Sequence, residues 1–347
     1  MKPNELIAKI ENGELDKSFK KIYVSDSAVE EQKPRYIRTI KEFINLFGDD
    51  RDVFVLSAPG RTEVCGNHTD HNNGKVLAAS INLDAIAIAA KRDDMKINEK
   101  SEGHGLNEVD ISTLSPDEAE YGRSSSMIKG VAAGLKEKGY EIGGFDACTT
   151  SDVMGGSGLS SSAAFEVLIA TVINHLYNDG KIDAVTVAKA AQFSENVYFG
   201  KPSGLLDQMA SSVGTFVTID FKDTANPVIK KVDFDFAKSG YSLCIVDTHG
   251  NHSDLTDDYA AVRGEMEAVA KAMGKNVLRE VEYEEFFQSL DVLKEKVNDR
   301  ALLRAFHFFG ENERVDKAVS SLENNDFDSF KQAITESGYS SFLYNQN

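Results

Sequence analysis

The feature that most restricts how this chain can fold is a glycine- and serine-rich turn between a strand and a long apolar helix. Residues 145–150 are predicted as the strand, and the apolar run 163–177 is predicted as the helix. Glycines let the backbone turn tightly and approach a ligand, and serines satisfy free N–H groups at a helix start. Those N–H groups and the helix dipole favour an anion. The turn therefore predicts an anion cradle, although a flexible turn with a serine cap is the simpler alternative that it leaves open.

The turn consists of Gly155-Gly156-Ser157-Gly158-Leu159-Ser160-Ser161-Ser162. It has neither the Gly-Lys-Ser/Thr ending of a P-loop nor the GxGxxG spacing of a dinucleotide fingerprint. Hydroxyls such as that of Ser162 can also ligate Mg²⁺, a hard cation that prefers oxygen.

The rest of the chain predicts an α+β protein. In the amino-terminal part we expect helices over 3–47, 181–198 and 205–213, a strand over 53–58 that ends at Pro59-Gly60, and strands within 76–90. After Gly214 we expect strands over 215–221 and 241–247 and helices over 254–273, 282–296, 300–309, 313–323 and 327–336. This change of pattern suggests a first domain of residues 1–213 and a second domain of residues 214–347.

Composition excludes several classes of function. The chain has 347 residues, enough for two domains, with 41% hydrophobic and 27% charged residues. Its formal net charge of -18 would repel nucleic acids and anionic membrane surfaces, so we expect neither as a partner. The three cysteines, Cys65, Cys148 and Cys244, form no CxxC pair and predict neither a disulfide framework nor a zinc site. No segment resembles a signal peptide or a membrane span, so we expect a cytoplasmic protein.

Residues 58–74 are dense in side chains that bind hydroxyl groups. Asn67, His68 and Asp70 can each form directional hydrogen bonds with a sugar, and Arg61 follows a Pro-Gly turn at a strand end. Three plainer interpretations remain. The run can be a polar surface loop, Arg61 can simply pair with a carboxylate, and His68, Asp70 and His71 can bind a transition metal, although three ligands in one loop are weak support.

Two carboxylates, Glu195 and Asp207, flank a Gly/Pro break in the chain. One could hold Mg²⁺ and the other could act on a substrate hydroxyl, which are the two tasks that phosphoryl transfer requires. Taken alone, both are more simply explained as solvated helix carboxylates.

In order along the chain, these segments resemble the galactokinases of the GHMP kinase family. APGRTEVCGNHTDHNNG (58–74) is similar to the galactokinase signature, and GGSGLSSSAAFEV (155–167) is similar to the second motif of the family. SENVYFGKPSGLLDQMASSVG (194–214) resembles the segment that ends in GIMDQ, and two later stretches, 246–270 and 304–315, look like later family segments. The resemblance covers about residues 40 to 347.

The resemblance implies a two-lobed fold with a mixed sheet in the amino-terminal lobe and a ferredoxin-like carboxy-terminal lobe. It implies an ATP-dependent sugar 1-kinase that uses Mg²⁺ and phosphorylates galactose at its anomeric hydroxyl. The expected partners are a small sugar and ATP, and the expected state is a monomer.

It also implies roles for individual residues. Arg61 would stabilise charge on the transferred phosphoryl group, and Asp207 would orient or deprotonate the hydroxyl; whether it is a true base stays open. Ser162 and Glu195 would hold Mg²⁺. The residues implied for the ATP phosphates are Gly156, Ser157, Gly158, Leu159, Ser160, Ser161 and Ser162. Those implied for the sugar hydroxyls are Asn67, His68, Asp70 and Tyr259.

The chain departs from the family at three places. Asn67 stands where galactokinases usually have Glu, and His71 stands where they usually have Tyr. The altered Asn67 raises the alternative of a galactose relative as substrate, such as N-acetylgalactosamine or a uronic acid. The glycine-rich third motif of the family is not found before Asn347, so we expect a truncated form or fragment with an incomplete second domain.

Two further classes stay open. One is a sugar sensor that resembles a galactokinase and binds sugar and ATP without efficient turnover. The other is a different GHMP kinase, such as a mevalonate or homoserine kinase, against which the segment His68-Thr69-Asp70 argues.

Overall fold

The computed structural model describes residues 1–201, 203–246 and 256–346. The chain divides into two compact units, Met1–Arg61 with Ser80–Val213 and Thr62–Ala79 with Gly214–Asn347. The second unit thus includes 62–79, a stretch that the sequence pattern placed in the first domain. Two long strands, β1 (Phe54–Cys65) and β2 (Lys75–Lys91), each run from one unit into the other.

The first unit is built on a mixed sheet. Its further strands are β3 (Lys96–Ser101), β4 (Leu106–Asp110) and β5 (Phe145–Ser151). β3 is parallel to β5, whereas β3 is antiparallel to β4 and β5 is antiparallel to β2. β1 also pairs with β2. The mixed sheet expected for the amino-terminal part is therefore confirmed.

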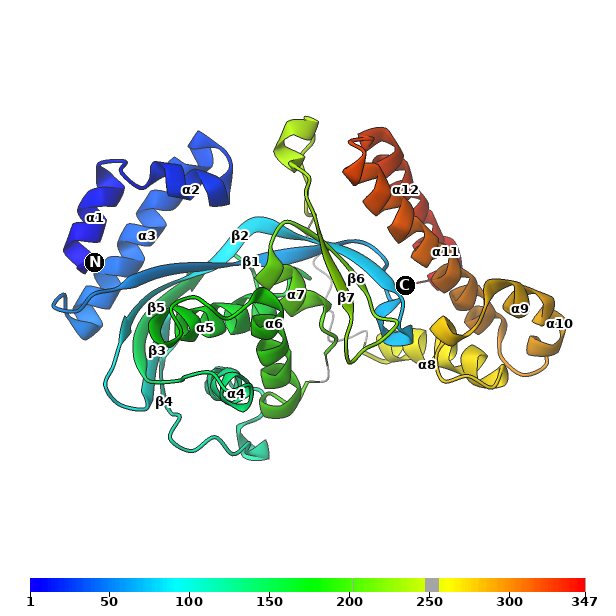
Figure 1. Cartoon of the computed structure of the whole chain (residues 1–347), viewed down its shortest axis with the longest axis horizontal. Coiled ribbons are helices and arrows are strands. Elements are labelled where there is room, and N and C mark those ends of the chain that lie inside the picture. Colours follow the sequence, from blue (N-terminus) through cyan, green and yellow to red (C-terminus); the bar gives the residue numbers. More distant parts are fainter. Residues whose placement is uncertain (202, 247–255, 347) are drawn as a thin grey trace. The chain divides into compact units, whose positions relative to one another are not determined.

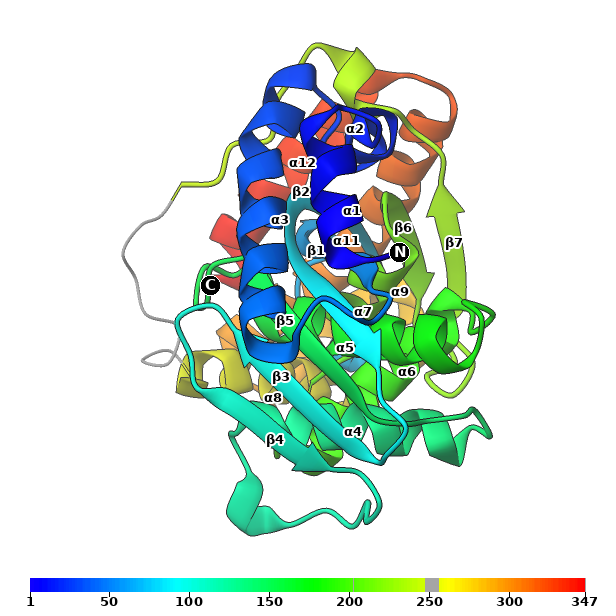
Figure 2. The ribbon, with the colours of Figure 1, turned by 90° about the vertical axis from the view of Figure 1, so that its left-hand side faces the viewer.

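Helices cover both faces of this sheet (Figures 1 and 2). They are α1 (Pro3–Glu11), α2 (Asp16–Tyr23), α3 (Asp26–Phe47), α4 (Ser124–Glu137), α5 (Ser161–Tyr177), α6 (Ala184–Phe193) and α7 (Leu206–Val213). Strand β2 shows how the faces are divided, because successive side chains of a strand point to opposite sides. Ile86, Ile88 and Ala90 belong to the core formed with α1 to α3. Ala85, Ala87 and Ala89 belong to the core formed with α4 to α6.

A buried ion pair fixes α3 to the sheet. Arg35 on α3 donates from Nη1 to Oδ1 of Asp84 at 2.7 Å and from Nη2 to the carbonyl oxygen of Asp84 at 2.8 Å. It also reaches Oδ2 of Asp152 at 3.0 Å and the carbonyl of Thr150 at 3.1 Å. Asp84 accepts two further hydrogen bonds, from the hydroxyls of Tyr23 and Ser57. The amino-terminal helices are therefore held by charge as well as by apolar packing.

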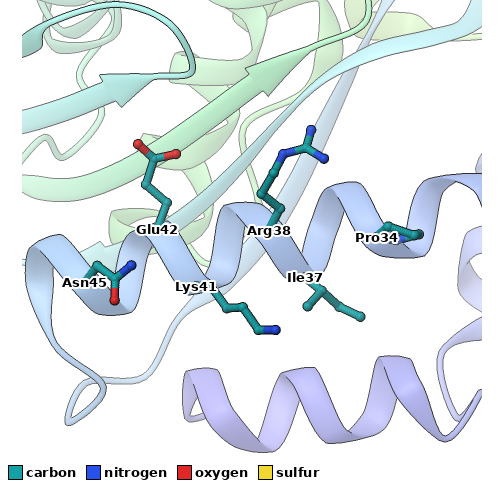
Figure 3. A pocket seen from close by; sticks show the side chains of 6 residues that line it. All are labelled: Pro34, Ile37, Arg38, Lys41, Glu42 and Asn45. Carbon is teal, nitrogen blue, oxygen red and sulfur yellow. The ribbon is translucent and has the colours of Figure 1, made fainter.

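The outer side of α3 carries a shallow hollow. Figure 3 shows the residues that line it, which are Pro34, Ile37, Arg38, Lys41, Glu42 and Asn45. Arg38 forms an ion pair with Glu102 at 3.0 Å, and both side chains are exposed. None of the residues predicted for the functional site lies in this hollow.

The second unit has a short antiparallel sheet and a helical part. Residues Lys75–Ala79 of β2 pair with β6 (Phe216–Asp220), and β6 pairs with β7 (Val228–Val232). The helices are α8 (Thr256–Ala272), α9 (Tyr283–Gln288), α10 (Leu290–Leu293), α11 (Asp299–Glu323) and α12 (Phe327–Ser340). One apolar core lies between this sheet and α11 and α12, and another joins α8 to α11. No helix in the described ranges is long and apolar enough to cross a membrane.

Several expected boundaries are wrong. β1 continues past Pro59-Gly60 to Cys65, and the carbonyl of Pro59 accepts a hydrogen bond from the hydroxyl of Ser211 at 2.7 Å. Gly310 does not end a helix, because α11 spans both expected helices and its packing outweighs the roughly 1 kcal/mol helix cost of glycine. The expected helix 282–296 is instead two short helices, α9 and α10. The strand pattern did not reveal β3, β4 or β7.

The strand expected over 241–247 is also wrong for the part that the structure describes. Residues 241–246 have no regular secondary structure, and residue 247 lies outside the described ranges. The side chains of Tyr241, Leu243, Ile245 and Val246 are exposed. A strand requires a neighbouring strand for its backbone hydrogen bonds, which a local pattern does not supply.

Candidate active site

The glycine-rich turn joins β5 to α5 in the first unit. Gly156 and Gly158 have φ angles of 75° and 78°, which side chains with a Cβ adopt rarely. Ser160 also lies in the left-handed region, with φ 62°. The buried side chain of Leu159 joins the core beneath the sheet and anchors the turn. The local geometry therefore depends on glycine at two positions and on tertiary contacts at the serine.

The hydroxyl of Ser160 does not cap α5. Ser160 precedes the helix but makes no side-chain hydrogen bond to its first turn. Its hydroxyl donates to Oδ2 of Asp207 instead. The interpretation of the turn as a serine-capped loop is therefore wrong at this position. The first N–H groups of α5 keep the polarity that favours an anion.

Arg61 connects the turn to Asp207. Its Nε donates to Oδ1 of Asp207 at 2.7 Å, and its Nη1 donates to the carbonyl of Gly158 at 2.6 Å. Its backbone N–H donates to the carbonyl of Leu159 at 3.1 Å. Both oxygens of the Asp207 carboxylate thus have a donor, one from β1 and one from the turn. Arg61 does pair with a carboxylate, as the plainer interpretation held, and its partner is the predicted catalytic aspartate.

Glu195 lies in a π-helical turn, Ser194–Tyr198, that continues from α6. Such turns often occur at functional sites. Its side chain is only 2% exposed, so the solvated carboxylate is the wrong interpretation here. Its Oε1 accepts from the hydroxyl of Ser162 at 3.0 Å and from Nζ of Lys201 at 2.7 Å.

The Ser162–Glu195 pair fits a magnesium ion. A hydroxyl and a carboxylate oxygen lie 3.0 Å apart, and hard oxygen donors are what Mg²⁺ prefers. The ammonium group of Lys201 already places a positive charge against the same carboxylate oxygen. Within the ranges that the structure describes, no group of three or more His, Cys, Asp or Glu residues could hold a metal ion. The transition-metal site considered for His68, Asp70 and His71 is therefore not formed. Mg²⁺ does not need such a group, because it typically binds one or two protein carboxylates together with substrate phosphates.

The residues expected to bind the sugar belong to the second unit. Nδ2 of Asn67 donates to the hydroxyl of Ser341, and the carbonyl of Asn67 contacts Nε2 of His307 at 3.1 Å. Burial lowers the pKa of His68 to about 4, although the charge of Asp70 acts in the opposite direction. The side chain of Tyr259, on α8, lies outside the described residues.

Three residues of the first unit were missed from the sequence. They are Gln208, Glu166 and Lys201. Nε2 of Gln208 donates to Glu195 at 2.7 Å and to Glu166 at 3.3 Å, and Nζ of Lys201 donates to Glu195 at 2.7 Å. One signal was available, because Glu166 is the only acidic residue in the apolar run 163–177. A buried carboxyl inside an apolar helix requires a partner.

Family models match two stretches of the chain. The "Galactokinase galactose-binding signature" matches residues 41–91, and "GHMP kinases N terminal domain" matches residues 126–215. A galactokinase of Streptomyces coelicolor is 34% identical over 82% of this chain and 73% of its own length. The chain belongs to the galactokinase family.

Other galactokinases agree with this membership. A relative from Clostridium tetani is 33% identical over 86% of this chain and 76% of its own length. The crystal structure of Lactococcus lactis galactokinase complexed with galactose matches with a TM-score of 0.71 and 26% identity, over 88% of this chain and 79% of that one. The mevalonate kinase of L. major matches with 14% identity and a TM-score of 0.51, over 85% of this chain and 76% of its own, and this likeness shows the fold alone.

Proposed function

We propose that this chain transfers the γ-phosphoryl group of ATP to the anomeric hydroxyl of galactose, giving galactose 1-phosphate and ADP. The observation that carries this proposal is the pairing of Arg61 with Asp207 at 2.7 Å beside the glycine-rich turn. An arginine, an aspartate and the N–H groups at the start of a helix are what a phosphoryl transfer needs at one place.

In this proposal, different residues of the first unit bind the phosphates, stabilise the transferred group and orient the sugar hydroxyl. The turn 156–162 binds the phosphates of ATP through its backbone N–H groups and the start of α5. Arg61 stabilises the negative charge that spreads over the transferred group. Asp207 accepts the hydrogen bond of the anomeric hydroxyl and aims its oxygen at the γ-phosphorus. A loose transition state asks for little deprotonation before attack, so this orientation matters more than base strength.

In this proposal Ser162 and Glu195 would hold Mg²⁺ through a hydroxyl oxygen and a carboxylate oxygen that contact each other in this structure. When bound, the ion neutralises charge on the phosphate oxygens. Lys201 then has to leave Oε1 of Glu195, and its exposed side chain is free to move into solvent.

In the second unit, Asn67, His68, Asp70 and Tyr259 are proposed to bind the sugar hydroxyls. Asn67 differs from the usual glutamate of the family, but its carbonyl oxygen can accept the same kind of hydrogen bond. A low pKa keeps His68 neutral at pH 7, so its ring can both donate and accept. This suits an uncharged sugar.

The alternatives left open by the sequence are not favoured. The matched relatives are galactokinases, and the signature that matches residues 41–91 is a galactose-binding one. A mevalonate or homoserine kinase has no support beyond the shared fold, and the intact pair of Arg61 and Asp207 argues against a sensor without turnover. Domains 1–213 and 214–347, a monomeric state and a cytoplasmic location stay predictions.

The test is ADP release in the presence of ATP, Mg²⁺ and galactose. We expect Asp207→Asn to lower kcat by at least about 100-fold while the affinity for ADP stays the same, since the lost interaction is made in the transition state. The matched control is Asp179→Asn, because this carboxylate is 81% exposed and forms an ion pair with the exposed Lys181. Near-normal turnover in Asp207→Asn would show that the proposed role is wrong, and no galactose-dependent ADP release in the unaltered chain would refute the function.

A further inference from the structure

A buried glutamine lies between two carboxyl groups behind the Ser162–Glu195 pair. Gln208 is fully buried and follows Asp207 in the first turn of α7. Its Nε2 donates to Oε2 of Glu195 at 2.7 Å and to Oε2 of Glu166 at 3.3 Å. Glu166 is also fully buried and lies on α5. The amide thus joins three elements, α5, α7 and the π-helical turn.

Two buried oxygens of this cluster lack a hydrogen-bond donor. Both hydrogens of the Gln208 amide are used. Within the described part of the chain, Oε1 of Gln208 and Oε1 of Glu166 are both buried without a hydrogen-bond partner. Each buried acceptor left without a donor costs about 1–3 kcal/mol.

One proton on the Glu166 carboxyl group would supply the donor that both atoms lack. If Glu166 carries it, the acid O–H can donate to the amide carbonyl of Gln208 while the amide N–H donates back. Burial raises the pKa of Glu166 to about 9, and the charge of Glu195 acts in the same direction. At neutral pH this agrees with a carboxyl group that donates rather than repels.

We propose that Gln208, held by Glu166, is a positioning residue that sets the orientation of Glu195 for the metal of the phosphoryl transfer. This rests on the proposed function. The amide holds Oε2 of Glu195 from behind, so that Oε1 faces the hydroxyl of Ser162. Without Glu166 the amide could turn over, and its carbonyl oxygen would then face Glu195 and repel it.

The hydrogen bonds of Gln208 also restrain the neighbouring Asp207. Gln208 is the next residue in α7, so the bonds that fix the glutamine restrain the backbone that carries the aspartate. Ligand-orienting residues of this kind typically change metal affinity by about 10–100-fold when removed. A residue that only filled space would change stability and leave metal affinity alone.

The experiment measures ADP binding by calorimetry with and without Mg²⁺ in Gln208→Met, Glu166→Met and Glu166→Gln. Methionine matches the length of these side chains and packs well in a core. We expect Gln208→Met to lose about 10-fold or more of the affinity that Mg²⁺ adds, with metal-free ADP binding unchanged. We expect a smaller loss in Glu166→Met and almost none in Glu166→Gln, whose neutral amide can still pair with Gln208.

A Gln208→Met variant that keeps the full Mg²⁺-dependent gain would overturn the proposal, and so would an equal loss with and without Mg²⁺. Should that variant fail to fold, the comparison of Glu166→Met with Glu166→Gln decides in the same way. The readout needs no galactose, so it stands apart from the test of the proposed function. Turnover adds a second check, because kcat should fall in Gln208→Met while KM for galactose stays within about twofold.

Discussion

Replacing Arg35 by methionine should destabilise the first unit severely. The Arg35 and Asp84 side chains are 6% and 1% exposed, and their closest atoms are 2.7 Å apart. At an effective dielectric constant of about 20, a contact of this length corresponds to roughly 6 kcal/mol of attraction, most of it offset by desolvation of the two charges. The variant keeps the cost of burying Asp84 and loses the attraction. Breaking such a pair from one side costs about 3–5 kcal/mol.

Urea unfolding followed by circular dichroism measures this loss. With an m-value near 2 kcal/mol/M, the midpoint should fall by about 2 M. The matched control is Arg38→Met, one turn further along α3, where the ion pair with Glu102 is exposed and worth less than about 1 kcal/mol. Figure 3 shows Arg38 among the residues of α3 that line the hollow.

A second substitution separates charge from packing. Changing Asp84 to Asn in the Arg35→Met background removes the uncompensated charge, so part of the lost stability should return. Equal effects of Arg35→Met and Arg38→Met, or no recovery in the double variant, would refute the reasoning. The three hydrogen bonds that tie Arg35 to Asp84 and Thr150 would then contribute no more than surface contacts.

Three further outcomes are expected. Gly66→Ala should lower the stability of the second unit by at least about 2 kcal/mol, because φ is 103° and a Cβ would lie 2.5 Å from the carbonyl oxygen of Lys75. The control Gly264→Ala, on α8, should not lower it, because a Cβ there would meet no atom within 4 Å. Since the pKa of His68 is lowered from 6.5 to about 4, the folded state binds fewer protons than the unfolded state between these values. Stability should therefore be complete above pH 6.5 and fall towards pH 4, and His68→Asn should flatten this part of the unfolding profile. Lys201→Ala should lower the Mg²⁺ concentration needed for half-maximal activity, because its ammonium contacts Oε1 of Glu195 at 2.7 Å; a higher requirement would contradict that competition.

The local sequence pattern correctly predicted those helices whose apolar spacing lies within their own residues. The apolar run after the glycine-rich turn is α5, and the helical spacing before residue 47 is α1 to α3, because burial of one face follows from periodicity alone. The same applies to the glycines of the turn, since a positive φ at Gly156 and Gly158 is a property of the backbone at those positions.

Pattern failed where the outcome depends on distant partners. The strand-like residues 241–246 have no regular structure, whereas Gly310 stays inside a helix that packs on both sides. Neither result is encoded within a short window, because strand pairing and helix packing are satisfied by residues far away in the chain.

The sequence by itself determined which groups are available for the proposed chemistry: Arg61, Asp207, Ser162, Glu195 and the glycine-rich turn. Only the tertiary structure decided how they are arranged, because a hydrogen bond needs both partners within about 3 Å and Arg61 and Asp207 are 146 positions apart in the sequence. Folding directs the hydroxyl of Ser160 to Asp207 instead of to the helix start, and it encloses Glu195 between Ser162 and Gln208. Burial raises the pKa of Glu166. This shift requires the folded chain around the carboxyl group, so the sequence alone does not reveal it.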